Sequence, residues 1–422
     1  MKKVSKVSLA IATAMVTALS LSGCTGASTG GSAGGVTITF DHWGDNEENA
    51  TLKSMVALFE KANPDVTVQS NWIQSNYTQQ LQISIAGGQP ATVAQISNTD
   101  LPGFTSAFTP ASLDASDYYA ANIPDAMQVK GTAYAVPFTV KPKVMAIDKT
   151  MFEKAGIALP STDTPMTTQQ FAAVATKLTS GSGKSEVYGS APLWFEGWLN
   201  AEGGTFFNAD GTDCTVGTPT AIDTTNFIID AQSAQGFTPS YLAQQGQDMF
   251  DWLSIGRLAM QPDFGPWNVA QLLALPNASD YELVPFPGKG EPMEVDGLAV
   301  SNKATSAQAA AAQKFVNFMA TDTSAQELLT TKASSLGVPV VQAAISEFKS
   351  TAPGLAMSTF INAVSQSQIT EPPKQYSQIQ STFDNSLSSQ TAIGSGHGNP
   401  ATVLPQLQKA CQQTLGSEGS GQ

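Results

Sequence analysis

Residues that could perform catalysis or bind phosphate are the first features to test in this sequence. Residues 181–185, Gly-Ser-Gly-Lys-Ser, imitate the end of a phosphate-binding loop. Such a loop also needs a glycine five residues before Gly183, and that position is Leu178. Residues 394–398, Gly-Ser-Gly-His-Gly, share only their composition with a reactive-serine turn, because a helical stretch precedes them and no strand does. Both runs are therefore interpreted as surface turns.

Acidic residues are abundant, but no pair of them indicates catalysis. The chain has 422 residues, with 34 Asp and Glu against 20 Lys and Arg and a formal net charge of −14. Paired carboxylates such as Glu196 and Glu202 could hydrolyse a glycosidic bond, but any chain this acidic contains such pairs. No nucleophile–base pair stands out. We predict that the protein is not an enzyme, and a secreted glycoside hydrolase stays open as an alternative.

The charge balance and the scarcity of metal ligands exclude further classes. Arg257 is the only arginine, and no cluster of cations is present to displace counterions from phosphate, so nucleic-acid binding is not expected. Two histidines and three cysteines make a metal centre built from these residues improbable. We predict no metal and no cofactor.

The six tryptophans suggest a ligand instead. Several stand where a predicted element begins or ends: Trp43 follows the first strand, Trp72 closes the second, and Trp267 begins a helix after Pro266. In open parallel sheets, ligands bind where the carboxyl ends of strands and the starts of helices converge. An indole face there can cover the C–H face of a sugar, while neighbouring Asp, Asn and Glu bond its hydroxyls. The alternative is that these tryptophans merely cap the core.

Strands alternate with helices along most of the chain, which predicts an α/β protein of parallel sheets with helices on both faces. The predicted strands are 36–40, 66–72, 92–96, 144–147, 257–261 and 297–301. The predicted helices are 46–62, 77–86, 149–155, 168–178, 219–235, 266–275 and 305–320. The last quarter is expected to be wholly helical. Thr167 is a predicted N-cap and Gly236 a predicted C-cap.

The first residues are typical of an export signal. Residues 1–23 combine three early lysines with an apolar stretch and end in Leu-Ser-Gly before Cys24. This ending resembles a bacterial lipobox, in which Cys24 is lipidated and becomes the mature N-terminus; an ordinary cleaved signal is the alternative. Residues 24–35 are rich in Gly, Ser and Thr and are interpreted as a flexible tether. We predict an extracytoplasmic protein anchored by lipid to the outer face of a bacterial cell membrane.

Two further cysteines, Cys214 and Cys411, could form a disulfide outside the cytoplasm. Pairing requires Cα atoms within about 7 Å, and the sequence does not measure that distance. Two separate buried thiols are therefore an equal alternative.

Ordered segments along the whole mature chain resemble the extracellular solute-binding proteins of ABC importers, specifically the maltose- and oligosaccharide-binding lipoproteins. No single motif carries the resemblance; the order and spacing of the segments do. They are 38–45 (Ile-Thr-Phe-Asp-His-Trp-Gly-Asp), 59–66 (Phe-Glu-Lys-Ala-Asn-Pro-Asp-Val), 134–138 (Tyr-Ala-Val-Pro-Phe), 148–157, 256–267 with Gly-Arg-Leu-Ala-Met and Gly-Pro-Trp, and 285–301 with Pro-Phe-Pro-Gly and Asp-Gly-Leu-Ala-Val-Ser.

The resemblance implies a two-lobed periplasmic-binding-protein-like fold (type II) with a hinge and an interlobe ligand cleft. Lobe one would comprise 36–139 and 297–332, and lobe two 140–296 and 333–416, followed by a flexible tail at 417–422. The chain would cross between the lobes three times. Closure of the hinge would present the loaded protein, a monomer, to the permease subunits of an ABC transporter.

The resemblance also implies which residues bind ligand. Trp267, in Gly-Pro-Trp, is the first candidate for stacking on a sugar, followed by Trp194 and Trp198, which precede the Asn200–Gly204 stretch. Polar side chains after the first and third strands would hold hydroxyls. The candidate ligand-binding residues are Trp43, Asp45, Asn46, Trp72, Asn98, Asp100, Trp194, Trp198, Asp263, Trp267 and Asp296.

Two alternatives to an oligosaccharide receptor remain besides the hydrolase. The same fold could bind a non-sugar solute such as a polyamine, with Asp45, Asp100 and Asp296 facing the cation. A purely adhesive lipoprotein would bind no small ligand at all.

Overall fold

Five strands form the larger of the two main sheets, and three of them run parallel. The computed structural model describes residues 35–290, 293–331, 336–367 and 371–416. Within these residues the first sheet has the order β2-β1-β3-β10-β6. Its strands are β1 (Val36–His42), β2 (Val66–Trp72), β3 (Val93–Ser97), β6 (Val136–Lys141) and β10 (Glu294–Val300). β2, β1 and β3 are parallel, whereas β10 is antiparallel to both β3 and β6.

The second sheet is smaller and wholly antiparallel, so the prediction of parallel sheets is wrong for this part of the chain. Its order is β8-β7-β9, with β7 (Val144–Asp148) between β8 (Met260–Phe264) and β9 (Tyr281–Val284). The cause is the path of the chain. β6 leads directly into β7, and β9 leads back toward β10, so the incoming and outgoing strands run in opposite directions in both sheets.

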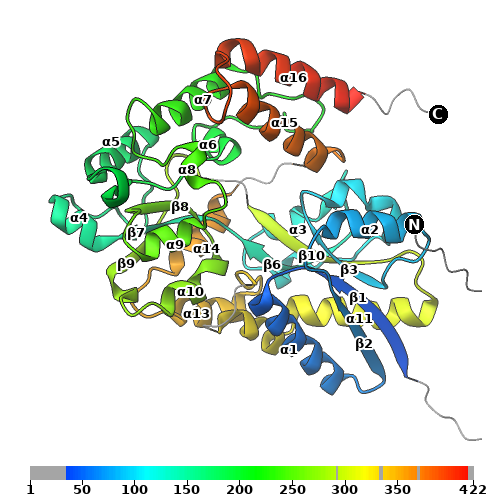
Figure 1. Cartoon of the computed structure of the whole chain (residues 1–422). Helices are drawn as coiled ribbons and strands as arrows, with labels where there is room; N and C mark the ends of the chain where they lie inside the picture. The colour runs from blue at the N-terminus through cyan, green and yellow to red at the C-terminus, as the bar shows by residue number, and fades with distance from the viewer. Residues whose placement is uncertain (1–34, 291–292, 332–335, 368–370, 417–422) are drawn as a thin grey trace, which may run out of the picture. The chain divides into compact units, whose positions relative to one another are not determined.

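Helices connect and cover the two sheets (Figure 1). They are α1 (Asn46–Ala62), α2 (Tyr77–Ala86), α3 (Asn122–Asp125), α4 (Lys149–Ala155), α5 (Thr168–Leu178), α6 (Phe195–Ala201), α7 (Pro219–Gln232), α8 (Tyr241–Gln244), α9 (Met249–Ser254), α10 (Val269–Leu273), α11 (Ser306–Thr321), α12 (Thr323–Gln326), α13 (Gln342–Ser350), α14 (Ser358–Gln366), α15 (Tyr376–Gln390) and α16 (Pro400–Gly416). Two short strands, β4 (Gln128–Val129) and β5 (Thr132–Ala133), pair as a separate ribbon.

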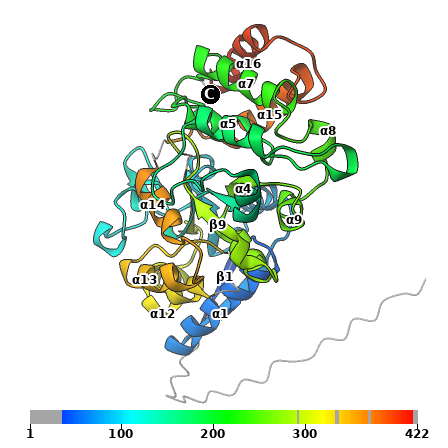
Figure 2. The same ribbon diagram turned by 90° about the vertical axis from the view of Figure 1, so that its left-hand side faces the viewer.

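Each sheet packs on a hydrophobic cluster of its own, and a third cluster contains residues of both sheets, such as Ile96 of β3 and Leu283 of β9. Alternate residues of β1, Ile38 and Phe40, are fully buried with α1 and α11, where the Phe59 and Phe315 ring centroids lie 5.1 Å apart. The second sheet packs against α5, α6 and α7, and α7, α16 and α15 pack side by side in both views (Figures 1 and 2). Strand alternation and helical periodicity thus place one apolar face of each element toward a core.

Most predicted boundaries are confirmed to within two residues, and those of three elements are wrong by three residues. The predicted strand 297–301 starts earlier, at Glu294. The predicted helix 219–235 ends at Gln232, because the Asp230 carbonyl accepts from both Ser233 and Gln235 and closes the last turn early. The predicted strand 257–261 starts later, at Met260. The predicted signal (1–23), nearly all of the tether (24–35) and the tail (417–422) lie outside the described residues. Among the described helices, none has the length and apolar character needed to cross a bilayer.

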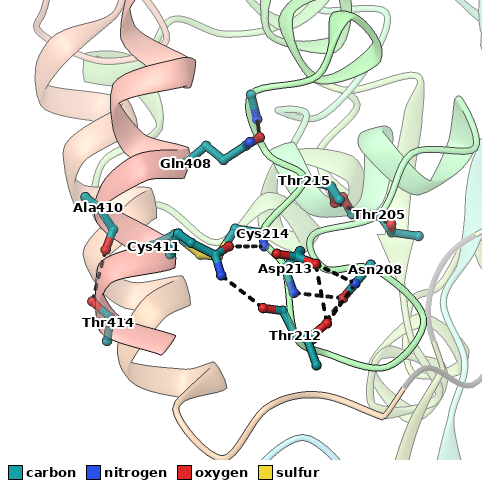
Figure 3. The surroundings of a disulfide bond; sticks show 12 residues. Thr205, Asn208, Thr212, Asp213, Cys214, Thr215, Gln408, Ala410, Cys411 and Thr414 are labelled. Carbon is teal, nitrogen blue, oxygen red and sulfur yellow. Dashed lines mark hydrogen bonds between the residues drawn. A yellow bond between two sulfur atoms is a disulfide. The ribbon is translucent and has the colours of Figure 1, made fainter. Parts of the chain in front are cut away.

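A disulfide joins α16 to the loop before α7, which settles the open question about the two cysteines (Figure 3). Cys214 and Cys411 are bonded, with their Cα atoms 6.2 Å apart. Gln412 reinforces the junction, because its side-chain oxygen accepts from the Cys214 N–H (3.0 Å) and its NH2 donates to the Thr212 carbonyl (3.0 Å). The bond closes a loop of 197 residues.

Candidate ligand-binding site

A cavity of about 560 Å³ opens where β1 and β2 end and α1 and α2 begin. Its lining residues are Trp43, Gly44, Asp45, Ile73, Gln74, Ser75, Asn76, Tyr77, Thr78, Ser97, Asp100 and Glu294. Trp43 and Tyr77 meet edge to face, with ring centroids 4.9 Å apart. The half-buried Trp72 at the end of β2 fixes the loop that follows β1, because its indole N–H donates to the Gly44 carbonyl at 2.9 Å. The cavity therefore combines aromatic rings with carboxylates.

The first turn of α1 positions Asp45 at the cavity. Asp45 is the N-cap of α1: its carboxylate accepts from the Glu48 N–H, and the Glu48 carboxylate accepts from the Asp45 N–H, both at 2.8 Å. This capping box satisfies two N–H groups at the start of the helix. Asn46 follows as the first helical residue and is exposed.

Asp100 also faces the cavity, whereas Asn98 has a structural role. Asp100 accepts from the Thr78 hydroxyl of α2 at 3.0 Å and from the Ser377 hydroxyl of α15, so it links two elements far apart in sequence. Asn98 is buried and exchanges two hydrogen bonds of 2.9 Å with the backbone of Val295 in β10. Its side-chain oxygen is thereby committed to holding the sheet.

A buried cluster of charged side chains lies between β6, β10 and α1. The Lys141 ammonium at the end of β6 lies 3.0 Å from Asp296 in β10 and 3.2 Å from Glu48. Gln95 donates to the same Asp296 oxygen at 3.0 Å. Burial raises the pKa of Asp296 to about 7, although Lys141 opposes the rise. Burial lowers the pKa of Lys141, but Asp296 and Glu48 outweigh it and raise that pKa overall.

Asp296 therefore does not line the site in this structure. Its side chain is fully buried, and it compensates the charge of Lys141. The sequence predicted that Asp296 faces a ligand. In the structure its carboxylate has no exposed surface, so it has a structural role instead. Glu294, two residues earlier on β10, lines the cavity instead.

A second group of polar and aromatic side chains surrounds the start of α6. Trp194 is the N-cap residue of α6, and the Lys143 ammonium lies over its indole ring, 4.5 Å from the centroid. Glu196, in the first turn, accepts from the Tyr376 hydroxyl at 2.8 Å and from the Gln380 amide at 2.6 Å. Burial raises the pKa of Glu196. Trp194 and Tyr376 are both half-buried, so each ring keeps part of its surface exposed.

Trp198 belongs to the core, although it was expected to stack on ligand. Its side chain is fully buried, with the Phe171 ring centroid 4.7 Å and the Phe286 centroid 5.3 Å away. Trp194, four residues earlier at the N-cap of α6, is half-buried instead. No face of Trp198 is exposed to a solute.

Asp263 and Trp267 lie at the end of β8 and are both half-buried. Trp267 sits in a short 3-10 helix, Pro266–Asn268. Its ring covers Gly265 so closely that a Cβ there would lie 2.2 Å from a ring atom. Burial raises the pKa of Asp263, while the Lys143 ammonium opposes the rise. Lys143 therefore acts electrostatically on both Asp263 and Glu196.

The structure thus brings Trp43, Asp45 and Asp100 to one cavity and groups Trp194 and Asp263 around Lys143. Sequence reasoning missed four residues of these surroundings, namely Tyr77, Lys143, Glu294 and Tyr376. Lys143 carried a signal, since the two lysines in the otherwise mostly apolar run 136–147, Lys141 and Lys143, must find partners. The described residues contain no cluster of His, Cys, Asp or Glu suited to a metal.

Residues 43–326, well over half of the chain, match the family model of bacterial extracellular solute-binding proteins. The chain therefore belongs to the bacterial extracellular solute-binding protein family. An uncharacterized lipoprotein from the oleD 5′ region of Streptomyces antibioticus is 30% identical over 187 residues, which are 41% of this chain. The match spans only 39% of that relative.

Solved structures share the fold over nearly its whole length. The ABC substrate-binding protein Lmo0181 of Listeria monocytogenes, in complex with cycloalternan, has a TM-score of 0.78 at 21% identity, covering 90% of this chain and 99% of that one. The GacH receptor of Streptomyces glaucescens, studied unliganded and with acarbose, gives 0.73 at 19%, covering 90% and 98%. The sugar-binding protein MalE of Xanthomonas citri gives 0.75 at 18%, covering 91% and 98%. The two-lobed fold is confirmed.

Proposed function

We propose that this solute-binding protein captures an oligosaccharide between its lobes and delivers it to the permease of an ABC transporter. The observation that carries the proposal is the cavity in which Trp43 and Tyr77 stand beside Asp45, Asp100 and Glu294. Aromatic faces cover sugar C–H groups, and carboxylates accept from sugar hydroxyls. The sugars bound by the structural relatives are consistent with this cargo.

Trp194, Tyr376, Asp263 and Trp267 would contribute from the second lobe. Trp194 and Tyr376 are held by Lys143 and Glu196 respectively, and such fixed rings lose little freedom when a ligand binds. Ligand that bridges both lobes favours the closed form only through its differential affinity for it. A shift from 1:99 to 99:1 needs about 5.5 kcal/mol, and a micromolar ligand supplies about 8 kcal/mol in total.

We also propose that Cys24 carries the lipid anchor, that the protein acts as a monomer without a catalytic step or cofactor, and that lobe boundaries fall near 139 and 297. Mass spectrometry of protein isolated from membranes would detect the acylated cysteine. An unmodified mature N-terminus other than Cys24 would contradict the anchor alone and leave the binding function untouched.

The experiment that tests the cargo is a titration of intrinsic tryptophan fluorescence in the soluble domain with a panel of oligosaccharides. A saturable change with one glycan is expected, with the glycan recovered unchanged by chromatography. Trp43→Ala should weaken that response about tenfold or more, because it removes an aromatic wall of the cavity. Cleavage of the glycan would favour the hydrolase, and silence across the panel would contradict a sugar cargo.

A cationic solute is the second candidate, because the lining of the cavity contains three carboxylates, Asp45, Asp100 and Glu294, and no lysine, arginine or histidine. Spermidine belongs in the panel for this reason. Attraction between exposed charges is screened at high salt, whereas stacking and neutral hydrogen bonds are not. Affinity that falls steeply with added NaCl would identify the cation, and affinity that stays constant would identify the sugar.

A further inference from the structure

A second, smaller cavity lies at the hinge, apart from the ligand cavity, and the proposed function does not use it. Its volume is about 130 Å³. Both crossovers line it, Pro142–Lys143 between β6 and β7 and the residues after β9, together with α14 and the loop that follows α6. The lining residues are Pro142, Lys143, Asp163, Pro165, Asn200, Gly203, Gly204, Thr205, Pro285, Phe286, Lys289, Gly290, Thr359, Asn362, Ala363, Gln366 and Ser367. We call this cavity the hinge pocket.

The polar lining of the hinge pocket is rich in hydrogen-bond donors. Lys143 and Lys289 both line this one small cavity, in a chain with 34 acidic and 20 basic residues. Asn200, Asn362 and Gln366 add amide groups that can donate. Asp163 is the one carboxylate in the lining; Asp163 and Lys289 are both exposed, whereas Lys143 is half-buried. The ligand cavity shows the opposite balance, with three carboxylates and no ammonium group in its lining.

The backbone at the rim places the Lys289 ammonium. The Lys289 N–H donates to the Ala201 carbonyl at 2.9 Å, which ties the second crossover to the end of α6. Gly203 has a φ of +79°, and a Cβ at this position would lie 2.4 Å from the Lys289 Nζ. Two features therefore require glycine at position 203: the left-handed backbone conformation, and the Lys289 side chain that lies where a Cβ would be. The ammonium rests where any larger residue would displace it.

Lys143 connects the hinge pocket with the ligand site. Its ammonium lies 4.5 Å from the centre of the Trp194 ring, and the charges of Glu196 and Asp263 act on it from the second lobe. An anion in the hinge pocket would therefore meet Lys143 in competition with these two carboxylates. Lys289 lies on a different crossover, and an anion between the two lysines would bridge the hinge.

We propose that the hinge pocket is a binding site for a small oxyanion, such as phosphate, held by Lys143 and Lys289 and by the amides around them. With a volume of about 130 Å³, the pocket has room for an ion of the size of phosphate. Ammonium-to-oxyanion hydrogen bonds are about twice as strong as neutral ones. Because both crossovers line the pocket, the bound ion acts on the hinge rather than on the sugar.

The test is an isothermal titration of the soluble domain with inorganic phosphate, against NaCl of matched ionic strength. Saturable binding of one phosphate per chain, half complete below about 10 mM, is expected and chloride should give none. Lys289→Gln should weaken phosphate binding about three- to tenfold. Lys303→Gln is the matched control, because it makes the same charge change at an exposed residue of the loop before α11 and should have no effect.

The variant Gly203→Ala tests whether the position of the Lys289 ammonium matters, because it leaves the net charge of the protein unchanged. It keeps both lysines but displaces the Lys289 ammonium, so phosphate affinity should fall as it does in Lys289→Gln. Near-UV circular dichroism would verify that both variants are folded, and the sugar titration should be unchanged in Lys289→Gln because that residue does not line the ligand cavity. Equal phosphate affinity in wild type, Lys289→Gln and Lys303→Gln would overturn the hinge site, and it would leave the sugar proposal standing.

Discussion

Two lysines on the first crossover, Lys141 and Lys143, occupy opposite environments although one proline separates them. Lys141 is buried and contacts two carboxylates, Asp296 at 3.0 Å and Glu48 at 3.2 Å. Lys143 is half-buried, lies over the Trp194 ring and lines the hinge pocket. The comparison shows that one short segment serves two purposes. Its first lysine holds β6, β10 and α1 together, and its second contacts the Trp194 ring and lines the hinge pocket.

The largest expected effect comes from removing the buried member of the pair. Lys141→Met leaves Asp296 and Glu48 as uncompensated carboxylates in the interior, so we expect it to lower the free energy of unfolding by about 3–5 kcal/mol. Urea denaturation followed by fluorescence would measure the loss. Lys143→Met is the matched control and should cost less than about 1 kcal/mol.

A double variant sharpens this first prediction. Lys141→Met combined with Asp296→Leu removes both charges of the closest contact, so it should recover part of the lost stability, since a buried pair replaced by apolar side chains is often neutral. If wild type and Lys141→Met were equally stable, Lys141 would not compensate the charges of Asp296 and Glu48. The contrast between the two lysines would then be wrong.

The two tryptophans of the α6 region repeat the same contrast. Trp198 is fully buried among Phe171 and Phe286, so Trp198→Ala should cost about 3–5 kcal/mol. Trp194 is half-buried, so Trp194→Ala should cost less stability but weaken sugar binding. Thermal unfolding and the fluorescence titration, run on both variants, would separate the roles. Loss of sugar affinity in a folded Trp198→Phe variant, with Trp194→Ala unaffected, would reverse the assignment.

Local patterns predicted the elements well, and long-range geometry explains what they missed. The predicted N-cap Thr167 follows from chemistry within a few residues, and the structure confirms it. The predicted C-cap Gly236 is wrong, because α7 ends at Gln232 with Ser233 as its C-cap. The core position of Trp198 and the burial of Asp296 depend on partners that are distant in sequence, such as Phe286 and Lys141. Residue type alone cannot distinguish a stacking indole from a buried one.

Tyr376 and Lys143 illustrate the same limit within the candidate site. Tyr376 begins α15, and only the fold brings its hydroxyl to Glu196, 180 residues away. The antiparallel second sheet was also hidden, because the direction of β9 follows from the return of the chain to the first sheet. The resemblance to a family placed the tryptophans in broad regions, whereas their depth required coordinates.

The pH dependence of stability provides a third test of the buried cluster. The folded pKa of Asp296 is about 7, above the unfolded value near 3.8. Its contribution is therefore fully present below about pH 4 and is lost as the pH rises to about 7, at most on the order of 4 kcal/mol. Urea midpoints at several pH values would show this decline for wild type. In Asp296→Asn the decline should be shallower, and identical slopes in the two proteins would exclude Asp296 as its source.

The smallest expected effect on stability, and the most informative about ligand, belongs to Lys143. Its ammonium orders the Trp194 ring through a cation–π contact at 4.5 Å, an interaction of about 0.5–1 kcal/mol at a partly exposed position. Lys143→Met should therefore leave unfolding nearly unchanged and weaken sugar binding about three- to fivefold, because the ring must then be ordered by the ligand itself. Lys143→Arg retains a cation that can stack on indole and should restore most of the affinity. If Lys143→Met and Lys143→Arg bound sugar as tightly as wild type, Lys143 would have no role in sugar binding. The first crossover would then contain a structural lysine, Lys141, and a lysine that serves only the hinge pocket, Lys143.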